Sequence, residues 1–293
     1  MKIGTVSQVW RYPVKSMSGE RVSKIMLDAL GAVGDRCWTM LEKENGDIAW
    51  GKSAPKLMNL SARYVAEPPE VRVFGDMVPQ VIVESPDGEL YETRAEIDAA
   101  ISAYVGRPLT IHPLEAPDNL DHYRWETPVD EAGIKRILGL RADEPMPDMS
   151  VYPPELLGML SEFFAPPGSY NDMSALHIVT TSAMEHMSRK TGEHFDVRRF
   201  RPNFVIDTDT TKDGIPEFDW IGARLKVGDV LLGVDAKTVR CSMPARGQAL
   251  NGLMQSAGVA KGLAKMTGRF FGISLSVVSE GVINEGDAVE LLK

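Results

Sequence analysis

The sequence has little cysteine and no long apolar run, and each of these absences excludes some classes of protein. Its 293 residues include only two cysteines, Cys37 and Cys241. Two are too few for a disulfide framework, a four-cysteine zinc site or an iron–sulfur cluster built from this chain alone. No stretch approaches the roughly 18 to 20 consecutive apolar residues of a membrane-spanning helix. We therefore expect an ordinary globular protein in which a functional thiol acts singly.

Basic residues are in the minority. The chain has 32 Lys and Arg against 41 Asp and Glu, which gives a formal net charge of -9. This balance argues against a nucleic-acid partner, because such a partner normally requires a basic face. An anionic ligand would need a local cluster of cations. Residues 1–10 lack the charged region, apolar stretch and cleavage site of a signal peptide, so we expect a cytoplasmic protein.

Short apolar runs separated by turn residues predict a β-rich sandwich or barrel in the first ninety residues. These runs are 3–10, 22–27, 38–41, 71–74 and 81–84. Thr93 and Glu96 then form a capping-box pattern ahead of a helical apolar spacing, and Gly106 supplies the stop. We assign residues 1–110 to one domain that is closed by this helix.

The middle of the chain, residues 111–153, is rich in Pro, Asp and Glu and has no sustained period beyond a possible helical turn at 134–138. We interpret it as a connecting region. Residues 154–293 form the second domain in this interpretation, beginning with an apolar helix after Pro153. Strands are predicted at 177–180, 204–207, 224–227, 230–234, 239–242, 272–278 and 288–291. The predicted fold class is mainly β with a few helices, that is, α+β.

Two features of the second half could bind an anion. The strand at 177–180 runs into a helix for which Ser182 and Glu185 form a capping box, and backbone N–H groups at such a helix start attract anions. Downstream, residues 198–201 place three guanidinium groups within four positions of an acidic chain. Ion pairs with Asp196 or Asp207 are the alternative explanation for that cluster.

The two cysteines have different sequence environments. Cys241 lies at the end of an apolar strand beside Arg240, and an adjacent guanidinium favours the thiolate. A lone cysteine in a strand can equally be a small buried hydrophobe, and we assign Cys37, next to Trp38, to that role. The five histidines show no metal-ligand spacing, and we expect none of them to be catalytic.

Taken in order, these elements resemble the MOSC proteins. Tyr12-Pro13-Val14-Lys15-Ser16, Gly31, Gly34-Asp35-Arg36 and Pro55-Lys56-Leu57 resemble the MOSC N-terminal β-barrel domain. Arg199-Phe200-Arg201-Pro202-Asn203, Asp219-Trp220, Gly228-Asp229, Arg240-Cys241, Gly281, Gly286-Asp287 and Val289 resemble the MOSC domain itself. The layout is most similar to the mitochondrial amidoxime-reducing component and its bacterial relatives.

The resemblance implies a MOSC-type β-barrel that binds the molybdenum cofactor, with Cys241 as the catalytic thiolate on the metal. It also implies which residues contact the pterin or its phosphate. These are Lys15, Ser16, Arg36, Thr180, Thr181, Ser182, Arg201, Asn203 and Arg240. A phosphorylated dithiolene pterin is polyanionic and suits Arg, Lys and a helix N-terminus, and a thiolate is a soft metal ligand.

The function implied by the resemblance is a molybdenum-dependent oxidoreductase that reduces small N-oxygenated (N-hydroxylated) substrates. Because we find no NAD or flavin fingerprint, we expect a separate ferredoxin- or flavoprotein-type electron donor. One alternative is a molybdenum-cofactor or sulfur carrier that acts through a persulfide on Cys241. Another is a cysteine-dependent hydrolase, for which no histidine is convincingly placed.

Overall fold

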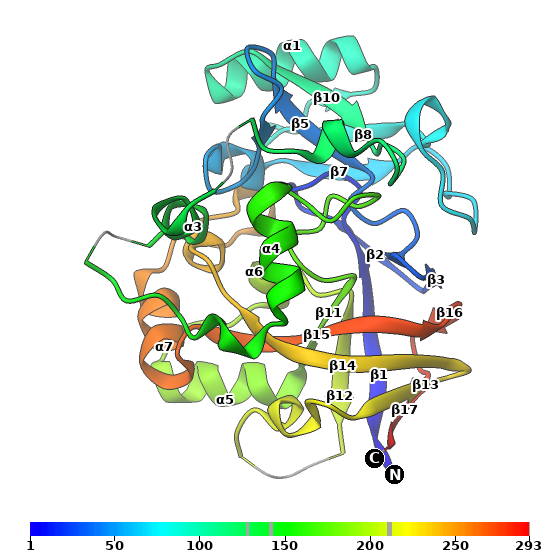
Figure 1. Cartoon of the computed structure of the whole chain (residues 1–293), viewed down its shortest axis with the longest axis vertical. Coiled ribbons are helices and arrows are strands. Elements are labelled where there is room, and N and C mark those ends of the chain that lie inside the picture. Colours follow the sequence, from blue (N-terminus) through cyan, green and yellow to red (C-terminus); the bar gives the residue numbers. More distant parts are fainter. Residues whose placement is uncertain (127–128, 141–142, 210–212, 293) are drawn as a thin grey trace.

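A closed β-barrel forms the lower half of the molecule in the computed structural model, which describes residues 1–126, 129–140, 143–209 and 213–292 (Figure 1). Seven strands within these ranges build the barrel in the order β12-β11-β15-β14-β13-β17-β1, and β1 closes it on β12. Their bounds are β1 Lys2–Arg11, β11 Leu176–Thr180, β12 Phe204–Thr208, β13 Arg224–Val227, β14 Val230–Val239, β15 Phe270–Ser279 and β17 Ala288–Leu292. The predicted mainly β, α+β fold class is confirmed.

The first strand of the chain belongs to the same barrel as the last. β1 pairs antiparallel with both β12 and β17, and the short β2 (Glu20–Val22) extends it. Alternate residues of the barrel strands point inward, as Val230, Leu232 and Val234 do along β14, and together they fill an apolar core. Strands from residues 1–110 and strands from residues 154–293 therefore share this core.

Three small sheets complete the β-structure of the described ranges. They contain β5 Trp38–Glu42 with β6 Ile48–Ala49 and β10 Leu109–Pro113; β7 Ser61–Tyr64 with β8 Val81–Glu84 and β9 Leu90–Tyr91; and β3 Lys24–Asp28 with β4 Gly31–Ala32 and β16 Gly281–Asn284. A second apolar core around Trp38 lies beneath α1 (Arg94–Val105). The capping box of Thr93 and Glu96 and the stop at Gly106 are confirmed.

The connecting region contains short helices. These are α2 Leu120–Tyr123, α3 Glu131–Leu138 and η3 Met149–Val151, and α4 Pro154–Glu162 follows directly after the region. The remaining helices are η1 Pro55–Asn59, η2 Gly75–Met77, α5 Thr181–Thr191, α6 Val197–Phe200, η4 Pro216–Trp220, η5 Met243–Ala245, η6 Ala249–Asn251 and α7 Ala257–Thr267. Among the described residues, no helix combines the length and apolar character needed to cross a membrane.

Three local predictions were wrong. Residues 71–74 form no strand but an irregular segment that leads into η2, and Val71 is 65% exposed rather than packed in a sheet. The strand predicted at 239–242 is the end of the continuous β14, which stops at Val239 ahead of η5. Thr180, not Ser182, caps α5, because its side chain accepts the N–H of Ala183.

Candidate functional site

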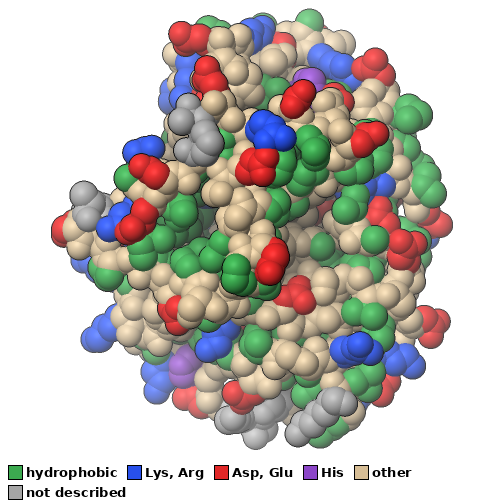
Figure 2. Space-filling model, viewed as in Figure 1, with side chains coloured by type: hydrophobic (Ala, Val, Ile, Leu, Met, Phe, Trp, Pro, Cys, Tyr) green, Lys and Arg blue, Asp and Glu red, His purple; other side chains and the backbone are tan. Residues whose placement is uncertain are grey.

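A cavity of about 260 Å³ lies between the barrel, the loops of the N-terminal half and the connecting helices. It brings Cys241 together with most of the residues implied to bind a cofactor. Those that line it are Lys15, Ser16, Arg36, Arg201, Asn203 and Arg240. On the face drawn in Figure 2, hydrophobic side chains gather around a hollow in the region of α3 and α4, both of which contribute lining residues.

Lys15 and Ser16 reach the cavity from the turn that follows β1. Lys15 is 4% exposed, and its Nζ donates hydrogen bonds to the Tyr170 carbonyl at 2.7 Å and to Asp172 Oδ1 at 2.5 Å. Burial lowers the pKa of Lys15, although Asp172 opposes that shift. The Oγ of Ser16 accepts the N–H of Gly51 at 2.8 Å, which ties this turn to the loop after β6.

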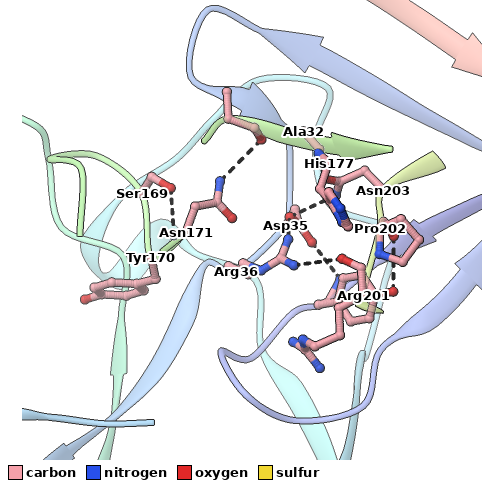
Figure 3. Close-up of polar contacts among 12 residues, drawn as sticks. Ala32, Asp35, Arg36, Ser169, Tyr170, Asn171, His177, Arg201, Pro202 and Asn203 are labelled. Carbon is pink, nitrogen blue, oxygen red and sulfur yellow. Dashed lines mark hydrogen bonds and ion pairs between the residues drawn. The ribbon is translucent and has the colours of Figure 1, made fainter. Parts of the chain in front are cut away.

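Arg36 is held by Asp35, a buried carboxylate that also joins two other segments (Figure 3). Asp35 accepts from Arg36 Nη1, from the Tyr12 N–H at 2.8 Å and from Asn203 Nδ2 at 3.0 Å. Arg36 Nη2 donates to the Arg201 carbonyl at 3.2 Å. These contacts fix one guanidinium of the N-terminal half against the Arg201–Asn203 segment.

Arg201 presents an unpaired hydrogen-bond donor. Its Nη1 donates to the Met17 carbonyl and its guanidinium carbon lies 4.3 Å from the centroid of the Tyr12 ring, whereas Nη2 is buried with no partner in the described part of the chain. Burial, with a smaller contribution from Arg36, lowers the pKa of Arg201 to about 10. A buried guanidinium N–H without an acceptor is costly, so this donor is suited to an anionic ligand.

Arg240 immediately precedes Cys241 and contacts His177. Its Nη2 donates to the Phe200 carbonyl at 2.8 Å, and its Nη1 lies 3.4 Å from His177 Nε2. The same His177 Nε2 lies 3.4 Å from the Phe271 carbonyl, so it accepts from Arg240 in one tautomer and donates to Phe271 in the other. Burial and the charge of Arg240 lower the pKa of His177 well below its ordinary value, so the imidazole is neutral. The Nε of Arg240 is a second buried donor without a partner among the described residues.

Backbone geometry also singles out this cavity. Four non-glycine residues of the described ranges have a positive φ, and three of them, Ser16 at 71°, Arg36 at 50° and Arg201 at 54°, line it. The left-handed conformation costs an ordinary residue on the order of 1–3 kcal/mol, and such residues cluster at functional sites. The fold therefore tolerates strain where it positions these side chains.

Several lining residues were not predicted from the sequence. They are Lys52, Asn171, Asp172, His177 and Arg199. Lys52 Nζ lies 4.3 Å from the Trp50 ring centroid and 3.4 Å from Asp172 Oδ2. Burial would raise the pKa of Asp172, but Lys15 and Lys52 outweigh it and hold that pKa well below the usual range. Only Arg199 had a sequence signal, as a member of the guanidinium cluster at 198–201.

Thr180, Thr181 and Ser182 do not line the cavity. Thr180 is the last residue of β11, and Thr181 and Ser182 begin α5, whereas His177, near the start of β11, does line the cavity. Thr180 Oγ1 donates to Glu217 Oε2 at 2.7 Å, Thr181 Oγ1 donates to Asp207 Oδ1 at 2.9 Å, and Ser182 Oγ accepts from Thr208 at 2.9 Å. His177 and Thr180 are three residues apart on one strand, so their side chains point to opposite faces of the sheet.

The charges of the cavity suit a polyanion. Six cationic side chains line it, against one carboxylate, Asp172, among the described lining residues. The cations are Lys15, Arg36, Lys52, Arg199, Arg201 and Arg240. Within the described ranges, no group of three or more His, Cys, Asp or Glu side chains is placed to hold a metal.

Comparison with known proteins matches both halves of the chain to domain families. Residues 3–98 match the MOSC N-terminal beta barrel domain, and residues 166–290 match the MOSC domain. The chain is 23% identical to human mitochondrial amidoxime-reducing component 1, over 99% of this chain and 84% of that protein. It is 37% identical to bovine mitochondrial amidoxime reducing component 2, but only over 22% of this chain and 20% of that protein.

A solved structure, the YuaD protein from Bacillus subtilis, aligns with 99% of this chain and 95% of its own at 11% identity and a TM-score of 0.44. The two domain matches follow one another in the order that the sequence motifs predict. The chain therefore belongs to the MOSC proteins, with a MOSC N-terminal β-barrel domain ahead of the MOSC domain.

Proposed function

We propose that this protein is a molybdenum-cofactor-binding oxidoreductase that reduces N-hydroxylated small molecules. The observation that carries the proposal is the convergence of Cys241 with six cationic side chains in one cavity of an acidic protein. The similarity to proteins named amidoxime-reducing components supports the same reaction class. At 23% identity, the N-hydroxylated substrate and the electron-donor partner are both part of the proposal.

The donors of the cavity fit a phosphorylated pterin. Lys15, Arg36 and Arg201 would bind its anionic groups, with Ser16 beside them. Buried donors without a partner in the described chain, Arg201 Nη2 and the Nε atoms of Arg199 and Arg240, are available for acceptors on the ligand. Charge-assisted hydrogen bonds of this kind are roughly twice as strong as neutral ones. Asn203 lines the cavity, but its amide already contacts Asp35 and the His177 N–H, so it supports the site.

Cys241 would supply the protein thiolate. Arg240 and Lys52 line the same cavity and interact electrostatically with its sulfur, which places two cations beside a soft metal ligand. When bound, the cofactor would supply two-electron redox chemistry and a Lewis-acidic metal. The chain's own residues would hold that group. Electrons would come from a separate ferredoxin- or flavoprotein-type protein.

The test is to produce the full chain in molybdate-supplied cells and to measure molybdenum, pterin and labile sulfur per chain. Reduction of benzhydroxamic acid by reduced methyl viologen is then followed with the same preparation. Stoichiometric molybdenum and pterin with turnover would support the proposal. Labile sulfur on Cys241 without turnover would instead establish a carrier, and a protein with neither cofactor nor labile sulfur would overturn both.

A further inference from the structure

Trp125, α3 and α4 build one side of the cavity from residues outside both family matches, which end at residue 98 and resume at residue 166. We call this side the apolar wall. It consists of Trp125, Ile134, Ile137, Leu138, Leu157 and Leu160, which lie before α3, on α3 and on α4. The cationic side chains all come from other segments. The cavity is therefore divided into a charged side and an apolar side.

The apolar wall begins at Cys241. The Ser242 N–H donates to the Leu138 carbonyl at 3.1 Å, which joins the end of α3 to the residue after the cysteine. Gly139, with φ of 68°, allows this approach, because a Cβ there would lie 2.4 Å from Ser242 Oγ. Cys241 also packs against the apolar cluster that contains Leu138. A molecule at the cysteine sulfur would thus contact the wall.

The wall is anchored to the barrel. The Tyr152 hydroxyl, between α3 and α4, donates to the Lys237 carbonyl at 2.7 Å and accepts the Val239 N–H at 2.9 Å. Trp125 is bound to α4 through its backbone N–H, which donates to the Glu162 carbonyl at 3.0 Å, and through its indole N–H, which donates to the Leu160 carbonyl at 3.2 Å. These contacts make the wall a preformed surface.

Aromatic rings line the corner where the apolar wall meets the charged side, since Lys52 Nζ lies 4.3 Å from the Trp50 ring centroid. The Trp50 and Trp125 ring centroids lie 5.6 Å apart at 59°, and those of Trp125 and Phe164 lie 6.0 Å apart at 77°. Tilted and edge-to-face rings of this kind form a favourable environment for a further flat ring. A polyanionic cofactor would occupy the charged side, which leaves this surface for an uncharged apolar group.

We propose that the apolar wall is the substrate subsite and that it selects N-hydroxylated compounds bearing an aromatic or bulky apolar group. This inference rests on the proposed function and names its substrate class. A short polar N-hydroxylated compound would leave the wall in contact with water, so the wall would add little to its binding free energy. An aromatic compound would bury its ring against Leu157 and the Trp125 corner.

The test compares two probes that share one reacting group, benzhydroxamic acid and acetohydroxamic acid. Dissociation constants are measured by quenching of tryptophan fluorescence in the full-length protein from molybdate-supplied cells. Values of kcat/KM are measured with the same protein and with reduced methyl viologen as the electron donor. We expect the aromatic probe to bind at least about tenfold more tightly. Leu157→Asn should remove most of that preference, whereas Leu157→Met should keep it.

The matched control is Leu156→Asn, on the same helix but not lining the cavity. It should leave the preference unchanged, and melting curves of all three variants separate loss of folding from loss of selectivity. Equal binding of the two probes, or an equal loss in Leu156→Asn and Leu157→Asn, would overturn the wall as a subsite. Protein without molybdenum and pterin would overturn the proposed function instead, and fluorescence would still report whether the wall prefers the aromatic probe.

Discussion

The side-chain amide of Asn203 donates a 3.0 Å hydrogen bond to Oδ2 of Asp35, a residue 168 positions earlier in the chain. Both side chains are almost completely buried, with 1% and 2% exposure. Asp35 also binds Arg36, and the Oδ1 of Asn203 accepts the His177 N–H at 3.2 Å. This pair consequently fixes the two cation-bearing segments of the cavity against each other.

Asn203→Asp should destabilise the fold by about 3 kcal/mol or more. The substitution keeps the shape of the side chain but places a second buried carboxylate beside Asp35 and removes the donor between them. Urea unfolding at neutral pH measures the loss. Asn284→Asp is the matched control, because Asn284 donates to Asp287 in an exposed position and should cost under about 1 kcal/mol. Equal losses in the two variants would contradict the structural role assigned to Asn203.

Cys241→Ser should abolish reductase activity and change the spectroscopic signature of bound molybdenum while the fold stays largely intact, because a hydroxyl is a poor substitute for a soft thiolate. Cys37→Ala should retain the metal and lower the free energy of unfolding by only about 1 kcal/mol. Cys37 is buried in the core, and burial raises the pKa of its thiol. Full activity in the Cys241 variant, or metal loss in a folded Cys37 variant, would show that the wrong cysteine was chosen.

Lys15→Ala, Arg36→Ala and Arg201→Ala should each lower cofactor affinity about ten- to more than a hundredfold. Each removes charge-assisted hydrogen bonds worth roughly 1.5 to 3 kcal/mol. Pterin and molybdenum per folded chain provide the measurement, and Lys261→Ala, at an exposed position of α7, should have little effect.

Arg201→Lys should also lose affinity, because an ammonium keeps the charge but not the planar fork of the guanidinium. Unchanged occupancy in all three alanine variants would mean that the cofactor binds elsewhere.

Glu217 should make stability depend on pH. This carboxyl is fully buried against Thr180, and burial raises its pKa from 4.5 to about 7. Below pH 4.5 it is protonated in both the folded and the unfolded chain, so the associated stability is fully present. As the pH rises toward 7, the unfolded chain ionises first, and the free energy of unfolding should fall by up to about 3 kcal/mol.

Glu217→Gln should remove this decline, because the amide does not titrate but can still accept from the Thr180 N–H and donate to its hydroxyl. Urea unfolding between about pH 5 and about pH 8 measures the slope. Glu44→Gln, at an exposed position, should leave the slope unchanged. A slope that persists in Glu217→Gln would show that Glu217 is not its source.

Local patterns in the sequence determined the elements whose signals are themselves local. The capping box of Thr93 and Glu96 and the helix that begins at Pro154 both follow from neighbouring residues. The ordered motifs were sufficient to identify the MOSC resemblance, because they span both halves of the chain. The thiol, which lines the cavity, could also be singled out, since only two cysteines exist and one lies beside Arg240.

Only the tertiary structure decided which polar residues share the cavity. His177 and Thr180 lie on one strand, yet His177 contacts Arg240 and Thr180 binds Glu217, because the two faces of β11 pack against different parts of the fold. Lys52 and Asp172 meet across 120 positions, and α3 reaches Ser242 from more than a hundred residues away. Such contacts depend on how the barrel closes and on where the connecting helices pack, and no local pattern encodes either.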